Sequence, residues 1–565
     1  MRTKKYILLI IILVAAVLRL WKLGSIPPHL TPDEAALGYN AYSILKTGRD
    51  EYGELLPIIF KSFGDFKPGL YVYFTAPLIA ILGLNEWSVR LPSAIAGVFA
   101  VWLLYKIVLL FSEVLNNESR ITNHESLATI AALLLSISPW HIHFSRGAWE
   151  ANLSLTLTLA GIYFFLKSLK NSAFLIYSSL FFASTLLTYQ GAKLSTLIVL
   201  FILAIIFWND IRKFLSTKTV LIRSIIVGLI VTSPILFSLV QGKVGRLEIF
   251  SVFSYPRPTD YLQTFLDQGN EKIGSLTYYL FHPETLNFTR GIIGRWFNHF
   301  SGRLLFFEGD WQNPRHSAPN HGMLLLSDLV LLTFGLVALL KTKEVKFKVF
   351  VFLWLVLAPL PAVLSRDQVQ TVRSLSLIIP LVSISAFGLV FLFERIRRMP
   401  VRLIRVSGYF LFSVVFLGNL TYYFDAYFIH LPRHDSKLWE YGYKQIVETI
   451  TPIQSNYKTI KVQQSFAQPY IYFLFFQKYD PAKYQANSKL VESEYKGDVG
   501  YVLNLDNIEF TGIDWSVNRG DSGSLIIGDS LRIPPQDSND PKLFNTIKEI
   551  KYLDGTDAFR IIEVR

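Results

Sequence analysis

The sequence contains no cysteine, and this absence excludes disulfides, thiolate metal sites and cysteine nucleophiles. It is also poor in charge, since 17% of its 565 residues are Asp, Glu, Lys or Arg. A soluble domain carries about 25% of such residues, so a soluble globular protein is not expected. In their place, hydrophobic residues make up 51% of the chain. The missing cysteine is compatible with any redox compartment and therefore gives no location.

The apolar residues are gathered in runs of about 16 to 23 residues, the length that crosses a hydrocarbon layer of about 30 Å. Eleven runs stand out: 6–23, 89–111, 127–144, 151–168, 173–188, 192–208, 219–240, 323–340, 346–364, 375–393 and 404–424. The first follows a basic N-terminus and is not followed by a small-residue cleavage site, so we interpret it as an uncleaved span. The fold class predicted is a polytopic α-helical protein of the cell (plasma or inner) membrane.

A further stretch, 69–84, is apolar and aromatic but lies beside Pro68 and contains Pro77. It is either a span or an interfacial helix, and loop charge favours the second. If it lies on the membrane, the basic loops 341–348 and 394–405 fall in the cytoplasm, as positive loops usually do. We therefore expect eleven spans, a cytoplasmic N-terminus and two long external loops, 24–88 and 241–322.

The tail differs from the rest in composition. Short β-rich runs near 458–476, 498–505 and 523–528 alternate with helix-like stretches such as 436–450, which predicts a small extracytoplasmic α/β domain over 429–565 after a transmembrane domain over 1–428. The net charge of +13 is concentrated in short loops. Because no basic face interleaved with aromatics is found, nucleic acid is not expected as a partner, whereas membrane lipid is.

The first external loop contains Asp33 at the start of a predicted helix. An aspartate there often caps the helix, but it can also be functional, because polar residues of other external turns are predicted at the same membrane face. Ionisable residues at membrane depth are functional candidates by default. These further residues are Glu34, Asp65, Lys67, His141, His143, Arg146, Glu150, Tyr189, Gln190, Lys193, Arg366, Asp367 and Arg373.

The mixture of charges indicates a class of substrate. Cations such as Lys67 and Arg146 suit a phosphate leaving group, and a carboxylate suits an acceptor hydroxyl or amine that must lose a proton. The alternative for each basic residue is snorkelling to the interface. His141 and His143 share a face only on an extended segment, so no metal site is predicted from them. No cofactor is expected, although assistance by a divalent metal stays open.

Several motifs together resemble those of the bacterial members of the protein O-mannosyltransferase family, which include aminoarabinose transferases acting on lipid A. They are Asp33-Glu34, Asp65-Phe66-Lys67-Pro68 with Tyr71 and Tyr73, Arg90-Leu91-Pro92-Ser93, Ser145-Arg146 with Glu150 and Asn152, and Tyr189 with Lys193. The resemblance covers about residues 1–210 well and the remaining spans by architecture only.

The resemblance implies a C-type glycosyltransferase architecture, a polyprenyl-phosphate sugar donor and inversion at the sugar carbon. Asp33 is then the catalytic base, with Glu34 beside it in the catalytic motif. The donor phosphate is expected at Lys67, Arg146, Lys193 and Arg373. Substrate contacts are expected from Asp65, Tyr71, His141, His143, Glu150, Asn152 and Tyr189. Eukaryotic relatives carry a sugar-binding insert that the 241–322 loop lacks, and the acceptor stays open among lipid, glycan and protein.

Two other functions are compatible with a polytopic chain. A transporter or flippase of a lipid-linked sugar usually shows repeated halves and helices broken near the bilayer midplane. This sequence has no similar halves, and its ionisable residues are predicted at one face. A non-catalytic scaffold would use the tail to bind a partner. The pattern favours the transferase, and it indicates neither the sugar nor the acceptor.

Overall fold

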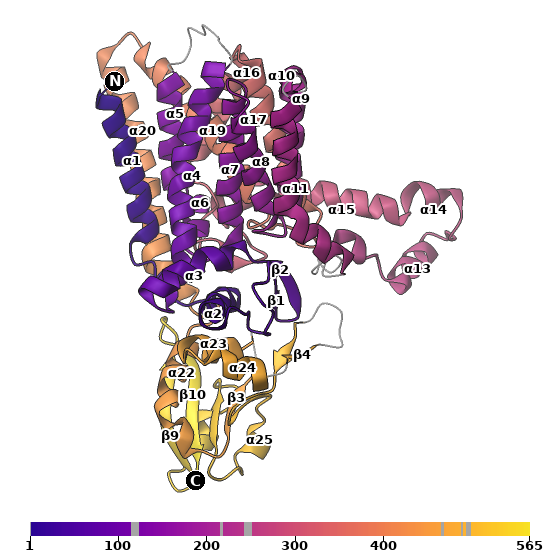
Figure 1. Cartoon of the computed structure of the whole chain (residues 1–565), viewed down its shortest axis with the longest axis vertical. Helices are drawn as coiled ribbons and strands as arrows, with labels where there is room; N and C mark the ends of the chain where they lie inside the picture. The colour runs from indigo at the N-terminus through magenta and orange to yellow at the C-terminus, as the bar shows by residue number, and fades with distance from the viewer. Residues whose placement is uncertain are drawn as a thin grey trace.

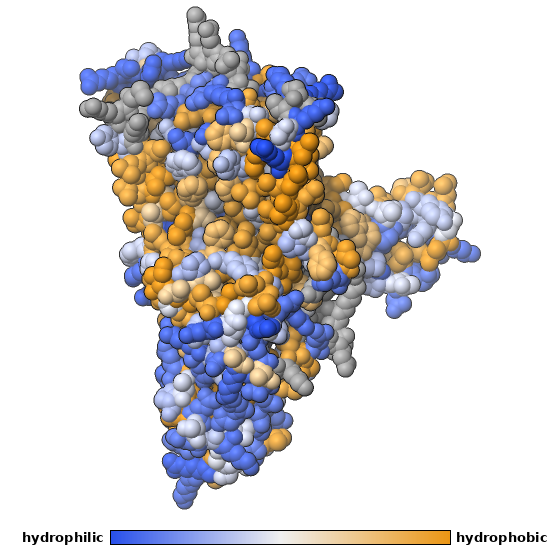
Figure 2. All heavy atoms as spheres, viewed as in Figure 1, coloured by the Kyte–Doolittle hydropathy of each residue, from blue (hydrophilic) through white to orange (hydrophobic). Residues whose placement is uncertain are grey.

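A bundle of apolar helices forms the larger part of the molecule, with a mixed α/β region at one end and an arm at its side (Figure 1). The computed structural model describes residues 2–114, 124–214, 218–241, 251–464, 468–487, 490–492 and 499–565. The apolar bundle and the polar region below it are distinct in the space-filling view (Figure 2). The predicted change of composition after the last apolar run therefore coincides with a change of structure.

Each of the eleven apolar runs is helical. The helices are α1 (Arg2–Leu20), α4 (Glu86–Val114), α5 (His124–Ile137) with α6 (Pro139–Ser145), α7 (Glu150–Ser168), α8 (Phe174–Leu186), α9 (Ala192–Ile206), α11 (Lys218–Val240), α16 (Ser327–Lys341), α17 (Val345–Leu357) with α18 (Leu360–Val363), α19 (Ile378–Arg397) and α20 (Arg402–Asp425). Within the described chain, five segments are long and apolar enough to cross a membrane, or up to seven if two bent pairs are counted. The total of eleven membrane spans stays a prediction.

One bend shapes the interior of the bundle. The chain turns by 59° between α5 and α6, where Ser138 precedes Pro139. Proline lacks the N–H that would continue α5, and it is well placed in the first turn of the next helix. All seven residues of α6 are buried. The segment predicted at the outer mouth of the spans therefore turns back into the bundle.

The first external loop is folded and contains a helix, a hairpin and a second helix. These are α2 (Pro32–Thr47), β1 (Ile59–Ser62) paired with β2 (Asp65–Pro68), and α3 (Leu70–Leu82). The 13 residues of α3 rise about 20 Å, short of the roughly 30 Å hydrocarbon layer. Figure 1 shows α3 at the end of the bundle, beside α2. Because α8 is equally short, the place of α3 at the end of the bundle is what favours the interfacial interpretation of 69–84.

The tail contains a six-stranded sheet in the order β6-β7-β3-β8-β10-β9. The strands are β3 (Ile460–Gln463), β6 (Asn504–Leu505), β7 (Ile508–Thr511), β8 (Leu525–Gly528), β9 (Phe544–Lys551) and β10 (Asp557–Val564). Strand β3 is parallel to both its neighbours, whereas the outer pairs are antiparallel. Helices α22 (Tyr443–Ile450), α23 (Tyr470–Phe476) and α24 (Pro481–Asn487) complete this α/β region.

The tail packs directly on the first external loop. Gly38 of α2 makes the close approach possible, because a Cβ there would lie 2.5 Å from Phe475 of α23 and 2.6 Å from Val89 of α4. The phenol of Tyr472 donates a hydrogen bond to the Leu30 carbonyl at 3.0 Å. Apolar residues of α2, α3, α23 and the sheet form one continuous core. The tail and the loop that carries Asp33 are therefore one packed unit.

Residues 251–322 project from the side of the bundle as an arm and then return (Figure 1). The arm consists of α13 (Thr259–Gln268), α14 (Leu276–Phe281) and α15 (Glu284–Asn298). It begins with an antiparallel bridge between Ser251 and Ser365, next to the turn that follows α18. Its outer part exposes large apolar side chains such as Leu276 and Phe281 (Figure 2). The returning residues, 301–322, pack against the bundle.

Candidate active site

Asp33 lies in the first turn of α2 but does not cap it. Thr31 is the N-cap: its hydroxyl accepts from the Glu34 N–H at 3.2 Å, and the Glu34 carboxylate accepts from the Thr31 N–H at 2.9 Å. This reciprocal pair is a capping box, which satisfies two N–H groups at the helix start. The Asp33 side chain is 58% exposed. The helix start is therefore capped without Asp33, and the Asp33 carboxylate is accessible at the surface.

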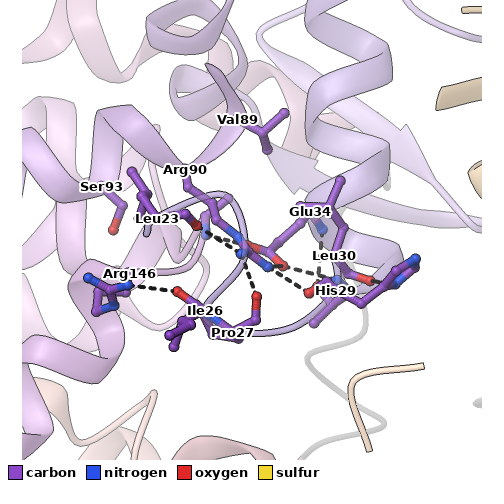
Figure 3. A network of polar contacts seen from close by, with 12 residues as sticks. Leu23, Ile26, Pro27, His29, Leu30, Glu34, Val89, Arg90, Ser93 and Arg146 are labelled. Carbon is purple, nitrogen blue, oxygen red and sulfur yellow. Dashed lines mark hydrogen bonds and ion pairs between the residues drawn. The ribbon is translucent and has the colours of Figure 1, made fainter. Parts of the chain in front are cut away.

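Glu34 forms a buried ion pair with Arg90 of α4. The Arg90 Nε lies 2.9 Å from one Glu34 oxygen, and Nη2 lies 3.2 Å from the other. The remaining guanidinium hydrogens go to carbonyls of the first external loop, at Leu23, Pro27 and His29 (Figure 3). A buried guanidinium is tolerated when all its donors are paired in this way. The pair fixes the start of α2 against α4.

Arg146 also forms hydrogen bonds with the backbone. Its guanidinium donates to the carbonyls of Leu18, Trp21 and Ile26 at 2.7, 2.7 and 3.0 Å, and it lies 5.0 Å over the ring of Phe428. The side chain is fully buried. These contacts hold the turn after α1. The phosphate-binding role expected of Arg146 stays a prediction.

Four other predicted substrate contacts lie in the core. His141 approaches Arg19, with 2.6 Å between Nδ1 and Nη2, and the Tyr71 phenol donates to the Val89 carbonyl at 2.9 Å. The Asn152 amide donates to the Ser93 carbonyl at 2.8 Å. His143 is enclosed by aromatic rings, including Trp439 at 6.2 Å between centroids. All four are buried, and their roles as substrate contacts stay predictions.

Lys67 is the centre of the polar cluster that the structure brings together. Its ammonium forms an ion pair with Asp33, and its side chain is 27% exposed. Burial alone lowers the pKa of Lys67, but Asp33, Glu150 and Asp65 outweigh it, so its pKa is raised. These three carboxylates come from α2, from the start of α7 and from β2. Four predicted site residues from three segments of the chain therefore come together around Lys67.

Tyr189 and Arg373 extend the cluster towards the turn after α18. Tyr189 lies in the turn between α8 and α9, where burial raises its pKa to about 12, and its phenol interacts with Arg373. The amide of Gln190 donates to the Phe66 carbonyl at 2.8 Å and ties this turn to β2. Arg373 in turn lies 3.7 Å from Asp367. Lys193 lies in the first turn of α9 and is half-buried.

One residue of this face, Glu440 from the tail, was not predicted from the sequence. Its carboxylate accepts from the Tyr472 phenol at 2.7 Å, and it lies near enough to Asp33 and Arg315 to interact with both. Burial raises the pKa of Glu440 from 4.5 to about 7. Glu440 lies in the tail, after the change in composition. No sequence pattern there predicts that the tail packs back on the loop that carries Asp33.

The returning part of the arm also reaches this region. Asp310 lies 3.2 Å from the ring of His316, and the same carboxylate accepts from the Thr371 N–H and hydroxyl at 3.0 and 2.8 Å. The His316 ring packs edge-on against Trp149 at 5.3 Å. Among the residues that the structure describes, no group of three or more His, Asp or Glu side chains has the arrangement of a metal site.

Replacing Arg90 by methionine is expected to destabilise the protein by about 3–5 kcal/mol, because the Glu34 carboxylate would stay buried without its counter-ion. Thermal unfolding of the detergent-solubilised protein measures the change. Lys46→Met, at an exposed position of α2, the helix that carries Glu34, is the control and should change stability little. Equal unfolding temperatures for the two variants would contradict the structural role of the pair.

Glu440→Gln tests the environment of the tail carboxylate. The folded pKa of about 7 lies above the ordinary 4.5, so the folded state is stabilised by the bound proton below pH 4.5 and loses this stability as pH rises to 7. The unfolding temperature of the wild type should therefore fall by several degrees between pH 5 and 8. That of Glu440→Gln should not show this fall. Exposed Glu448→Gln should follow the wild type. Parallel pH profiles for all three proteins would show that Glu440 is not buried as described.

The chain is similar to known proteins in two respects. Residues 67–237 match the family model of the dolichyl-phosphate-mannose-protein mannosyltransferases. No curated protein matches the sequence. Among solved structures, ArnT from Cupriavidus metallidurans in the apo state is 11% identical with a TM-score of 0.50, over 98% of this chain and 97% of that chain. ArnT bound to undecaprenyl phosphate gives the same identity and coverage with a TM-score of 0.52.

At 11% identity this likeness concerns the fold alone. The family match covers the region that contains Lys67, Glu150 and Tyr189, which confirms there the resemblance inferred from the motifs. The chain therefore has the fold of ArnT, and its residues 67–237 carry the sequence pattern of the dolichyl-phosphate-mannose-protein mannosyltransferase family.

Proposed function

We propose that this protein is a membrane glycosyltransferase that moves a sugar from a polyprenyl-phosphate donor to an extracytoplasmic acceptor. The observation that carries the proposal is the exposed Asp33–Lys67 ion pair, which lies close enough to Glu150 and Tyr189 for their charges to interact. It places a carboxylate and an ammonium side by side where an acceptor and a phosphate would meet. The undecaprenyl phosphate bound to ArnT supports a donor of this class.

The proposed reaction is a single inverting displacement. The acceptor hydroxyl or amine attacks the anomeric carbon of the sugar from the face opposite the phosphate. Its proton passes to the Asp33 carboxylate as the new bond forms. The bond between the anomeric carbon and the phosphate oxygen breaks, and its electron pair leaves with polyprenyl phosphate. One base and one cation that stabilises the leaving phosphate suffice, and the cluster contains both in Asp33 and Lys67.

Lys67 has two partners in this scheme. Before the donor binds, its ammonium pairs with Asp33 and holds both side chains in place. When the phosphate arrives, the ammonium turns towards it, and the Asp33 carboxylate becomes available to the acceptor. Arg373, which reaches the cluster through Tyr189, and Lys193 supply further positive charge for the phosphate. Glu34 is a positioning residue, because Arg90 and two backbone N–H groups occupy its oxygens.

The proposed topology puts this reaction outside the cytoplasm. Eleven spans with a cytoplasmic N-terminus place α2, the cluster and the 429–565 domain on the extracytoplasmic side. The basic loops 341–348 and 394–405 then lie inside. A lipid-anchored donor suits this location, because its reactive phosphate lies at the membrane surface while its chain stays among the helices.

Asp33→Asn should lower turnover by roughly 10²–10⁴-fold, since it removes the base, while binding of undecaprenyl phosphate should be largely retained. Mass spectrometry of envelope glycans and lipids, with the gene deleted and then complemented by each variant, identifies the product and its rate of formation. Glu54→Gln, an exposed carboxylate in the same loop, is the control. Full product formation by Asp33→Asn would remove this residue from the base role and favour a transporter or scaffold.

Lys67→Ala should weaken undecaprenyl phosphate binding or leaving-group stabilisation by about 1.5–3 kcal/mol, as for hydrogen bonds to charged groups. Lys61 is a closely matched control: it lies on the paired strand β1, forms its own ion pair with Glu492 at 2.6 Å, and is 26% exposed. Native mass spectrometry of the solubilised protein with undecaprenyl phosphate gives both affinities. The same affinity for Lys67→Ala and Lys61→Ala would contradict the phosphate contact.

A further inference from the structure

A cavity separate from the candidate active site lies between helix α15 and the turn that follows α18. Its volume is about 430 Å³, within the range of about 300–1,000 Å³ typical of small-molecule sites. Its lining combines two guanidiniums, one carboxylate, two side-chain amides and aromatic rings. These belong to Arg295, Arg366, Asp367, Asn287, Gln312 and Tyr255. None of these residues belongs to the Asp33–Lys67 cluster.

Arg295 is incompletely paired in this cavity. Its Nη2 reaches the Arg366 carbonyl at only 3.5 Å, and its buried Nε has no hydrogen-bond partner among the described residues. Gly291, one turn earlier on α15, leaves room for the guanidinium: a Cβ at Gly291 would lie 2.7 Å from the Arg295 Nη1. A buried donor without an acceptor is costly, and an anion in the cavity would satisfy it.

Arg366 contributes the second positive group. Its Nη1 donates to the Tyr255 hydroxyl at 3.0 Å, and the guanidinium lies 5.6 Å over the Tyr255 ring. The carboxylate of Asp367 is shared, because it also lies 3.7 Å from Arg373 and accepts from the Gln370 amide at 3.2 Å. The cavity is therefore positive on balance, and it suits an anionic ligand.

The cavity is connected to the candidate active site through side chains. Asp367 in its wall contacts Arg373, and Arg373 interacts with Tyr189. Tyr189 is close enough to Lys67 and Glu150 for their charges to act on it. The Asp367–Arg373 ion pair and the Tyr189 phenol therefore lie between a ligand in the cavity and the cluster.

We propose that this cavity binds an anionic sugar of the acceptor, such as a sugar phosphate or a uronic acid. The inference rests on the proposed function, which it extends by giving the acceptor a chemical class. Guanidiniums recognise phosphate or carboxylate, the amides of Asn287 and Gln312 suit sugar hydroxyls, and the rings of Tyr255 and Phe288 offer apolar faces. The donor phosphate, in contrast, belongs at Lys67.

Binding of glucose 1-phosphate to the full-length solubilised protein tests this site, with glucose as the uncharged probe. Ligand-observed saturation-transfer NMR gives the affinities for wild type and variants. Arg295→Gln and Arg366→Gln should each weaken glucose 1-phosphate binding at least tenfold. Arg290→Gln is the control, because Arg290 lies on the same helix and is exposed away from the cavity. Its affinity should equal that of the wild type, and glucose should bind more weakly than glucose 1-phosphate.

The variant Lys67→Ala distinguishes binding in the cavity from binding at the donor site. If the probe occupies the cavity, its affinity is unaffected by Lys67→Ala and lost with Arg295→Gln. Loss with Lys67→Ala and retention with Arg295→Gln would assign the probe to the donor site and overturn the inference. Equal binding of glucose and glucose 1-phosphate would also overturn it. Because this readout involves no transfer, it is independent of the Asp33→Asn test, so either proposal can fail alone.

Discussion

The arrangement of the candidate site depends on one buried carboxylate, that of Glu34. It accepts from Arg90 of α4, from the Thr31 N–H at the start of α2, and from the Ala148 N–H at 2.8 Å. Asp33 precedes Glu34 in the chain, and Glu150 follows Ala148 by two residues. A buried charge must keep its partners because losing one costs several kcal/mol. Through these contacts a single ion pair fixes the positions of Asp33 and Glu150.

Hydropathy predicted the helices well, since the apolar runs are helical throughout. It also predicted that Asp33, Lys67, Glu150 and Tyr189 gather at one end of the bundle. It did not predict the backbone contacts of Arg146, because an arginine that binds backbone carbonyls is identical in sequence to one that binds a phosphate. The difference is made by residues more than 100 positions away, such as Leu18 and Ile26, and no local pattern contains that information.

The tail shows a different limit of sequence interpretation. Its composition correctly indicated an α/β region, and nothing in it indicated that the region packs on α2. The contact depends on small features: Gly38 allows Phe475 to approach, and the Tyr472 phenol bonds both Leu30 and Glu440. As a result, the wall of the candidate site beside Asp33 is formed partly by the tail, which therefore belongs to the site and is not an independent appendage.

The charges around Lys67 suggest how a phosphate would enter. Asp33, Glu150 and Asp65 all act on this one ammonium, so the immediate surroundings are negative and repel an anion that approaches along α2. Arg373 and, beyond it, Arg366 and Arg295 lie on the other side of Tyr189. Positive potential thus rises from the cluster towards the arm. An anionic donor would therefore approach from the Arg373 side, with its sugar between Asp33 and the arm, where an acceptor held in the α15 cavity can reach it.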